Sequence, residues 1–405
     1  MDETKYWLWL NMVFGTGNHR IWEVMSFYNT AEKAYLSLSS DSSMVSLNEN
    51  ENKNIRNVPL RNAEVFLANC LKRGIGVISF VSQEYPDQLR HIYNPPSVLY
   101  YKGNISCLQT DLTVTGVGTR KASAYSLNAA KEICSELSMR GVVIVSGFAV
   151  GLDLACSMAA ADIGRPTVCV MGCGVDVDYP KPNFVYRDRI LSAGGVFLSE
   201  FPPGTQPISP NFPKRNRLLA ALGKVTIVFQ AAAKSGALIT ANLAAGQGRE
   251  VLCLPPADIF SGEYSGNIKL LRDGALSMYD ASDVMEFVTD GKKQPATSYT
   301  FVKESLPFGK RADEIEEAAA MLRDLDNTPN EPVKAFQEKV TAELPQDLSQ
   351  QQLRIAEALE SGAMHADELA QNLGLDTSEL MTELTELEIF GVIRSLPGKM
   401  YELIR

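Results

Sequence analysis

The residues of this chain best suited to chemistry are small groups of glycines, hydroxyl residues and bases that follow short apolar runs. One run ends in Gly116-Val-Gly-Thr-Arg120, and another ends in Ser146-Gly147. Glycine lets the backbone approach an anion, N–H groups at the start of a helix bind phosphate, and arginine offers phosphate a bidentate fork. These groups therefore predict contacts to phosphate oxygens.

Two more apolar runs lead into groups of the same kind. One leads into Gly172-Cys-Gly-Val-Asp176, followed by Lys181 and Asn183, and the other into Lys234-Ser-Gly-Ala-Leu-Ile-Thr240. A single group fits a plain strand-to-helix connection as well as a site, whereas four at one sheet edge favour an anion-binding surface. The candidate contacts in these loops are Gly116, Gly118, Thr119, Arg120, Ser146, Gly147, Gly172, Gly174, Lys181, Asn183, Ser235, Gly236 and Thr240.

A basic block, Phe212-Pro-Lys-Arg-Asn-Arg217, holds the densest positive charge in the same region. Cations that contact phosphates and an aromatic ring that stacks on bases are the components of single-strand binding. The alternative for Arg217 is structural, namely pairing with Glu200 or capping carbonyls at a helix start. The block adds Lys214, Arg215, Asn216 and Arg217 to the candidate phosphate contacts, with Phe212 as the candidate for base stacking.

The residues that hydrolytic, redox or metal chemistry needs are mostly missing. There are three histidines, and the His-Glu-x-x-His, Gly-x-Ser-x-Gly and P-loop patterns are absent. Seven cysteines include no Cys-x-x-Cys pair, which favours reduced core thiols over disulfides or a metal site. Asp153, Asp176 and Glu200 could form an acid–base set, but acids facing loop N–H groups and bases are often structural. We therefore expect no enzyme activity, no catalytic residue, no metal and no cofactor.

The apolar runs themselves predict the fold of residues 75–290. They alternate with helical patterns, and several are continuous valine and isoleucine runs, as in parallel strands buried on both faces. This alternation predicts an α/β fold with a doubly wound sheet. The expected strands are Gly76–Phe80, Val98–Tyr101, Leu112–Val117, Val142–Ser146, Thr167–Met171, Val196–Leu198, Val225–Gln230 and Glu250–Leu254, and the expected helices are Ala122–Arg140, Gly151–Ile163, Asn183–Ala193, Arg215–Ala221 and Thr240–Gly246.

Residues 1–74 predict a domain of short helices. A polar insert, Asp41–Asn54, interrupts the helical pattern. The turn Phe14-Gly-Thr-Gly17 resembles the hairpin of a helix-hairpin-helix unit, whose N–H groups point at phosphate, and it also fits a tight turn between helices. The expected helices are Tyr6–Phe14, Asn18–Tyr28, Thr30–Leu38 and Leu60–Lys72.

The C-terminal part divides into a linker and a small domain. Five prolines punctuate residues 291–348, where Ala312–Leu325 is the one stretch with a helical composition. Residues 349–405 then show three amphipathic helices, Leu348–Ser361, His365–Leu373 and Thr377–Phe390, followed by a β-hairpin around Pro397-Gly398. Three helices followed by a hairpin are the order of a winged helix.

The composition limits the class of protein. The chain has 405 residues with a net charge of −10, and 45% of the residues are hydrophobic, which excludes wholesale disorder. No run approaches the ~20 apolar residues of a membrane span, and the acidic N-terminus does not resemble a signal peptide. We therefore expect a cytoplasmic protein without a membrane partner.

An acidic protein is at first sight a poor nucleic-acid binder, but the charge is unevenly distributed. Residues 350–405 hold 4 bases and 10 acids, and residues 291–349 hold 8 bases and 11 acids. Residues 1–290 hold 26 bases against 27 acids and can still concentrate their bases at one sheet edge. The DNA site and the acidic tail are therefore expected to be different surfaces.

Taken in order, these motifs resemble the DNA-processing protein A (DprA, also called Smf) family. The resemblance covers essentially the whole chain and is specific as a set. Its motifs are Gly116-Val-Gly-Thr-Arg120, Ser146-Gly147 with Gly151-Leu-Asp153, Gly172-Cys-Gly-Val-Asp176 with Tyr179-Pro180, Ser199-Glu200, Phe212-Pro-Lys-Arg-Asn-Arg217, Ser235-Gly-Ala-Leu-Ile-Thr-Ala241, and Gly266-Asn267 before Gly274-Ala275.

The resemblance implies an N-terminal sterile-alpha-motif-like helical domain, an extended Rossmann fold and a C-terminal winged helix. It also implies cooperative binding of single-stranded DNA, protection of incoming DNA, dimerisation through the Rossmann domain and loading of the RecA recombinase in natural transformation. The DNA phosphates would be held by Arg120, Lys181 and the block 214–217. The glycine loops would add backbone N–H contacts, and Asn267 would be a further phosphate contact. The chain departs from the family pattern at Cys156, Gln230 and Pro256, which weakens any inherited acid–base role.

Two alternatives remain at this point. A Rossmann-like nucleotide-processing enzyme of the phosphoribohydrolase type would use similar phosphate loops, but its Pro-Gly-Gly-x-Gly-Thr loop is absent. The second alternative is an interaction scaffold whose work lies in the winged helix. This domain carries four glutamates and no base on its expected recognition helix, so a protein-contact or regulatory role suits it better than reading duplex DNA.

Overall fold

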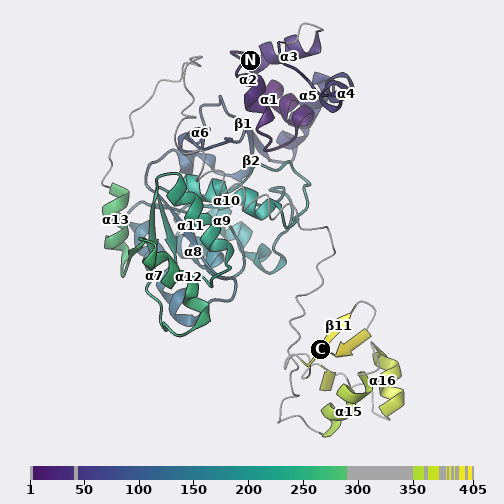
Figure 1. Ribbon diagram of the computed structural model, residues 1–405, viewed down its shortest axis with the longest axis vertical. Coiled ribbons are helices and arrows are strands. Elements are labelled where there is room, and N and C mark those ends of the chain that lie inside the picture. Colours follow the sequence, from purple (N-terminus) through teal and green to yellow (C-terminus); the bar gives the residue numbers. More distant parts are fainter. Residues whose placement is uncertain are drawn as a thin grey trace. The chain divides into compact units, whose positions relative to one another are not determined.

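The computed structural model describes residues 3–40 and 44–289 without interruption (Figure 1). In the C-terminal part it describes residues 350–359, 364–373, 380, 383, 384, 387, 392–396 and 400–403. The chain divides into two compact units, Met1–Asn327 and Thr328–Arg405. Among the residues that the structure describes, no helix has both the length and the apolar character needed to cross a membrane.

A nine-stranded sheet forms the centre of the first unit. Its order is β1-β2-β6-β5-β4-β3-β7-β8-β9, with parallel pairing from β6 to β9 and antiparallel pairing of β1 and β2 at one edge. This confirms the doubly wound α/β fold. The strands are β1 Gly76–Ser79, β2 Val98–Gly103, β3 Thr113–Val117, β4 Val143–Ser146, β5 Thr167–Val170, β6 Val196–Ser199, β7 Val225–Val228, β8 Glu250–Cys253 and β9 Leu276–Ser277.

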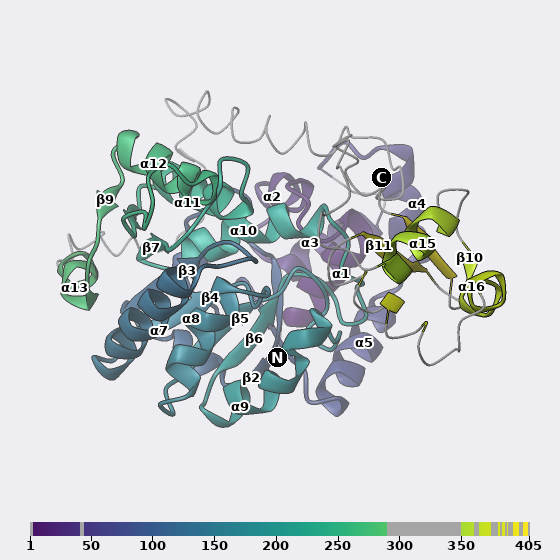
Figure 2. The ribbon, with the colours of Figure 1, turned by 90° about the horizontal axis from the view of Figure 1, so that it is seen from below.

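Helices cover both faces of this sheet, which explains its continuous apolar strands (Figure 2). In β4, Ile144 packs with α7 and α8, whereas Val143 and Val145 pack with α10 and α11 on the opposite face. Successive side chains of a strand point to opposite faces, so a strand covered on both sides is apolar throughout. The helices are α7 Ala124–Met139, α8 Leu152–Ala161 and α9 Arg187–Ser192 on one face, and α10 Asn211–Leu222, α11 Gly236–Gly246 and α12 Ser265–Arg272 on the other.

Three predicted helices differ from the structure by four residues or more, and one of them, predicted as Thr240–Gly246, begins at Gly236 as α11. The helix predicted to start at Arg215 begins at Asn211. Pro213 lies in its first turn, where backbone N–H groups have no partner within the helix, so the N–H that proline lacks breaks no hydrogen bond. The predicted helix Asn183–Ala193 is instead a 3-10 turn, η2, over Lys181–Tyr186, followed by α9. The pattern also does not predict β9, which is only two residues long, the helix α12, or the short elements α6 Asp87–Arg90, η1 Ile105–Leu108, η3 Gly262–Tyr264 and α13 Ala281–Thr289.

The N-terminal helices share a core with the antiparallel edge of the sheet. Trp7 and Leu10 pack in one buried cluster with Val98 and Tyr100 of β2. The Asn11 amide donates to the Ser97 hydroxyl at 2.6 Å, which satisfies both polar groups in this interior. The helical region therefore packs directly on the α/β sheet. Its helices are α1 Thr4–Phe14, α2 Arg20–Met25, α3 Ala31–Ser39, α4 Glu49–Asn57 and α5 Leu60–Lys72.

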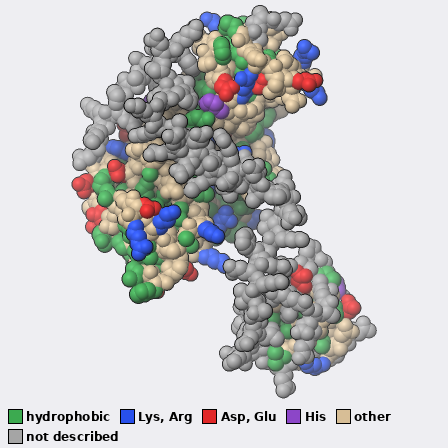
Figure 3. All heavy atoms as spheres, viewed as in Figure 1, with side chains coloured by type: hydrophobic (Ala, Val, Ile, Leu, Met, Phe, Trp, Pro, Cys, Tyr) green, Lys and Arg blue, Asp and Glu red, His purple; other side chains and the backbone are tan. Residues whose placement is uncertain are grey.

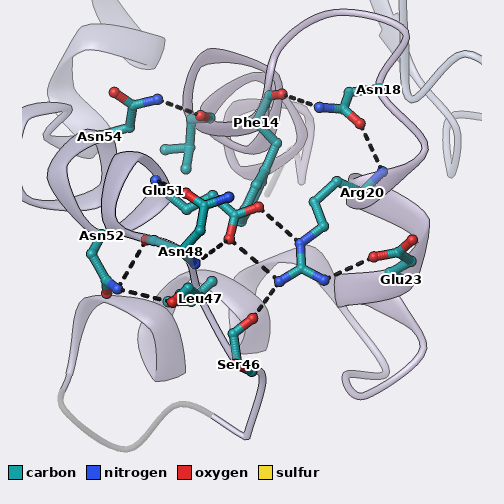
Figure 4. A network of polar contacts seen from close by, with 11 residues as sticks. Phe14, Asn18, Arg20, Glu23, Ser46, Leu47, Asn48, Glu51, Asn52 and Asn54 are labelled. Atoms are coloured by element: carbon teal, nitrogen blue, oxygen red, sulfur yellow. Dashed lines mark hydrogen bonds and ion pairs between the residues drawn. The ribbon is translucent and has the colours of Figure 1, made fainter.

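The expectation that Asp41–Asn54 is a break between helices is wrong over its second half, where α4 begins. This helix has no buried residue, so it shows no apolar periodicity. Asn48 and Glu51 form a capping box at its start, which satisfies N–H groups that a helix leaves unpaired. Arg20 binds Glu51 at 2.9 Å and Glu23 at 2.8 Å, and so ties α4 to α2 (Figure 4).

The second unit has the winged-helix architecture. Helix α15 (Gln350–Leu359), strand β10 (Met364–His365) and helix α16 (Ala366–Leu373) precede the hairpin of β11 (Ile393–Leu396) and β12 (Met400–Leu403). The third predicted helix, Thr377–Phe390, lies mostly outside the described residues. Its described leucines, Leu380, Leu384 and Leu387, are buried in the core of the unit. The predicted linker helix Ala312–Leu325 lies wholly outside the described residues.

Candidate phosphate-binding site

The loops that carry the predicted motifs meet at the carboxyl edge of the parallel strands. The winding direction of the sheet reverses between β3 and β7, which is where α/β folds bind ligands. The Thr119 N–H donates to the Gln230 carbonyl at 2.8 Å and joins the loops after β3 and β7. Farther along the edge, Ala231 N–H donates to the Asn267 side chain at 2.7 Å. The loops therefore form one continuous edge.

The motif glycines allow these loops to pack closely. A Cβ atom at Gly118 would lie 2.3 Å from the Leu152 side chain, and one at Gly172 would lie 2.8 Å from the Phe212 ring. At Gly147 it would lie 2.4 Å from the Asp153 carboxylate. Gly116, Gly147, Gly172 and Gly174 are all buried, while Gly118 is half-buried and Gly236 is exposed. The Gly118 N–H bonds to the Asp153 carboxylate, so among these glycines the exposed Gly236 is the one whose backbone is open to a phosphate.

The exposed cations of this edge are Arg120, Lys181 and Lys214 from the predicted set, with Thr119 half-buried beside Arg120. Lys121 and Lys234 are also exposed, in the loops after β3 and β7. Neither was among the predicted contacts, although they adjoin Arg120 and Ser235 in the sequence. Within the described part of the chain, no carboxylate forms an ion pair with Arg120, Lys121, Lys181 or Lys234. We call Arg120, Lys121, Lys181, Lys214 and Lys234 the loop-edge cations.

Arg215 is not part of this exposed set, because it lies in the interior with 5% of its surface exposed. Its guanidinium donates to the carbonyl of Gly147 at 2.9 Å and to the carbonyl of Val170. Burial lowers the pKa of Arg215 and raises the pKa of the neighbouring Asp153, whose charge Arg215 partly compensates. These contacts make Arg215 a structural residue that holds α10 against the loops after β4 and β5.

Arg217 has the structural arrangement that the sequence left as its alternative. One of its terminal nitrogens lies 2.5 Å from both carboxylate oxygens of Glu200, and both side chains are largely buried. The Gly15–Gly17 turn packs over this pair, with a Cβ at Gly17 placed 3.4 Å from the carboxylate. The Asn94 amide holds the same turn by donating to the Gly17 carbonyl at 2.6 Å. The hairpin-like turn thus faces the α/β fold.

Several polar candidates are also engaged inside the protein. The amide of Asn183 donates to the Phe148 carbonyl at 2.8 Å, and that of Asn267 donates to Phe229 and Leu254 carbonyls at 3.1 and 3.0 Å. Sequence alone cannot separate such residues from ligand contacts, because amide and hydroxyl groups suit both roles. The others are Ser146, which donates to Gly116; Asn216, which donates to Gly236; Thr240, which is buried; and Ser235, which caps α11.

The aromatic residue best placed for stacking is Phe184. The predicted candidate, Phe212, is half-buried and packs on Gly172 and on the Tyr179 ring at 5.5 Å between centroids. Phe184 lies three residues after Lys181 in η2, and 47% of its surface is exposed. No sequence signal separates it from Phe212, which lies two residues from Lys214, because only the exposure of the two rings in the structure differs.

On the face shown in Figure 3, several basic side chains gather on the lower part of the first unit, with acidic side chains beside them. Within the described residues, no three metal-ligating side chains come together, and all seven cysteines are free. The exposed cations of this edge offer electrostatic and hydrogen-bonding contacts to an anion.

The comparisons with known proteins agree with this architecture. The sequence model of the DNA recombination-mediator protein A family matches residues 76–289, and that of the DprA winged helix domain matches residues 339–399. DNA processing protein DprA of Bacillus subtilis is 37% identical over 54% of this chain and 73% of its own length.

Solved structures of similar proteins were also found. A crystal structure of DNA processing protein A from Streptococcus pneumoniae is 31% identical, with a TM-score of 0.61 over 71% of this chain and 98% of that one. DNA processing protein A from Helicobacter pylori, described for its single-stranded DNA binding mode, is 30% identical, with a TM-score of 0.48 over 53% of this chain and 95% of that one.

The contacts of Arg215 lead to a stability prediction. Arg215→Met removes the donors to Gly147 and Val170 and leaves Asp153 without its main compensating charge. Loss of one partner of a buried charge pair costs about 3–5 kcal/mol, so the free energy of unfolding falls by about that amount in urea titrations. Lys102→Met, at an exposed position of β2, changes it by no more than about 0.5 kcal/mol. An Arg215 variant of unchanged stability but weakened DNA binding would instead place Arg215 among the ligand contacts.

Proposed function

The chain belongs to the DNA recombination-mediator protein A family, and on this premise we propose that it binds single-stranded DNA. The observation that carries the proposal is the set of loop-edge cations on neighbouring loops at the carboxyl edge of the sheet. Lysine and arginine at such an edge neutralise successive phosphates and release the counterions bound to them. This electrostatic contribution to the binding free energy does not depend on the base sequence of the nucleic acid.

A single strand suits this site better than a duplex. Lys181 and the exposed Phe184 lie within the same short turn, η2, so a phosphate on Lys181 brings unpaired bases near the ring. Stacking of bases on aromatic side chains beside a cationic groove is how sequence-tolerant single-strand binders work. In a duplex the bases are paired and stacked on each other, so their faces are closed to the ring.

Three finer features of the function are also proposed. The family description as a recombination mediator supports a role in protecting incoming DNA and loading the RecA recombinase during natural transformation. Seven unpaired thiols suit the reducing cytoplasm as the site of action. Chemistry on the DNA is not part of the proposal, because the contacts of the site are those of a binder.

A homodimer is proposed through an apolar patch at the β9 edge of the sheet. Phe260 and Ile259, in the loop after β8, are 91% and 64% exposed, and Tyr279, just after β9, is 73% exposed. The Tyr125 hydroxyl donates to the Pro255 carbonyl in that loop. The pKa of Tyr125 is raised mainly by burial and, to a smaller extent, by the neighbouring phenols of Tyr264 and Tyr279. Contiguous exposed apolar side chains on a folded protein mark an interaction surface.

The phosphate contacts can be tested by salt titration. Arg120→Ala and Lys181→Ala each weaken binding of oligo-dT, because each removes one cation that neutralises a phosphate. Each cation removed makes the slope of log K against log salt shallower by about 0.7. The slope is measured by fluorescence anisotropy. Lys102→Ala removes a lysine at the amino edge of β6 and leaves affinity and slope unchanged. A double variant that binds like the wild type at every salt concentration would refute the site.

The stacking contact has a different signature. Phe184→Ala weakens oligo-dT binding by about 1–3 kcal/mol, or roughly fivefold to 150-fold, without changing the salt slope, because a ring neutralises no phosphate. Phe27→Ala, at an exposed phenylalanine of the N-terminal helices, serves as the matched control and leaves affinity unchanged. Equal affinities of the two variants would remove Phe184 from the site.

The dimer can be tested by changing the apolar patch. Leu276, in β9 at this edge, is 41% exposed. Leu276→Glu combined with Phe260→Ser places charge and polarity in the contact and shifts the protein to monomer in light scattering across a concentration series. Val65→Glu, at an exposed valine of α5, leaves the oligomeric state unchanged. A variant that remains a dimer at all concentrations would show that another surface is used.

A further inference from the structure

The segment 174–180, between β5 and η2, determines where Lys181 and Phe184 lie. It follows the buried end of β5 closely and runs without a helix or strand of its own into η2. The Gly174 N–H donates to the Thr205 carbonyl at 2.9 Å, which joins the segment to the loop after β6. The segment leads directly into η2, so it and the bond from Asn183 to the Phe148 carbonyl at 2.8 Å together position Lys181 and Phe184.

Arg187 of α9 holds the segment from within the α/β fold. Its guanidinium donates to the carbonyls of Val175 at 2.5 Å and Val177 at 3.2 Å and lies over the Phe197 ring, 4.5 Å from its centre. Arg187 belongs to the same face of the sheet as the rest of α9, so this contact is internal to the α/β fold. A second set of contacts comes from outside that fold.

Asp176 joins the segment to the N-terminal helices. One carboxylate oxygen lies 2.5 Å from the Arg73 guanidinium at the end of α5, and the other accepts the Gly204 N–H at 2.8 Å. The carboxylate is mostly buried, with 16% of the side chain exposed, so its geometry is constrained by both partners. One side chain thus connects α5, the segment and the loop after β6.

The neighbouring Val175 strengthens this connection. It is fully buried, and it packs in the cluster formed by the N-terminal helices and β2 rather than in the clusters of the α/β sheet. The segment is therefore bound to the helical region by an apolar contact at Val175 and by a charged contact at Asp176.

The charge of Asp176 points to a positional role. A carboxylate five residues before a cation that binds phosphate repels DNA, so simple electrostatics favours its removal. Its two specific contacts, by contrast, fix the backbone that carries Lys181. These two effects have opposite signs and can be separated by experiment.

We propose that Arg73 and Asp176 are positioning residues through which the N-terminal helical region sets the geometry of the DNA-binding segment. The proposal rests on single-stranded DNA binding by the loop-edge cations. Neither residue contacts DNA in this arrangement; both act by holding residues 174–180 so that Lys181 and Phe184 face one strand together. The helical region is thereby part of the DNA-binding apparatus without itself binding phosphate.

The test compares Arg73→Ala, Asp176→Asn and their double variant in the full-length protein, with Lys72→Ala as the matched control. Lys72 is an exposed base next to Arg73 on α5, so its removal changes the net charge equally. Asparagine keeps an oxygen for the Gly204 N–H and removes the charge that binds Arg73. Oligo-dT affinity at fixed salt and thermal unfolding are measured for each.

Each single variant is expected to bind about threefold to tenfold more weakly than the wild type, and the double variant no more weakly than the singles, because all three variants remove the same shared interaction. The midpoint of unfolding stays within about 2 °C, since a pair with one exposed partner contributes little to stability. Tighter binding by Asp176→Asn, additive effects in the double variant, or an equal weakening in Lys72→Ala would overturn the proposal.

Hydrogen–deuterium exchange separates this proposal from the binding function itself. Amides of residues 177–184 are expected to exchange faster in Arg73→Ala than in Lys72→Ala, with or without DNA. If the wild type fails to bind oligo-dT, the proposed function falls, and exchange still shows whether the helices hold the segment. Unchanged exchange in Arg73→Ala would overturn the positioning role even if the wild type binds DNA.

Discussion

The loop edge depends on one buried cation, the guanidinium of Arg215. A charge in the interior is tolerated only where hydrogen bonds and an opposite charge compensate it, and here the carbonyls of Gly147 and Val170 and the carboxylate of Asp153 do so. The same contacts require glycine at position 147, because a side chain there would collide with both charged groups. They also hold the first turn of α10 over the ends of β4 and β5, next to the exposed Lys214.

This arrangement divides the basic block among three environments. Successive residues of a helix are about 100° apart, so neighbours in sequence cannot all face one ligand. Lys214 is exposed, Arg215 is buried and Arg217 pairs with Glu200 beneath the Gly15–Gly17 turn. The exposed cations of this edge instead come from separate loops, one or two from each.

The N-terminal helices contribute to this edge through packing. They bury Val175 and the antiparallel strand β2 in their own core, and they reach the loops after β5 and β6 through Arg73 and Gly17. A rigid support limits the motion of these loops, because the loops themselves are too short to form a core. The acidic charge of the chain lies mainly after residue 290, outside the residues that form this edge.

The sequence by itself determined the doubly wound sheet, eight of its strands, the winged-helix order and the loops that follow those strands. These follow from local rules, since apolar runs, glycine turns and helix patterns are set by neighbours in the chain. It could not determine that α4 is a helix or that Phe184 rather than Phe212 is exposed. Nor could it determine that the side chains of Arg215, Asn183 and Asn267 form hydrogen bonds within the protein interior. Those outcomes are decided by the tertiary structure, because burial and the choice of partner for a polar side chain depend on residues distant in sequence. An arginine chemically suited to phosphate is equally suited to a pair of carbonyls, and only packing selects between them.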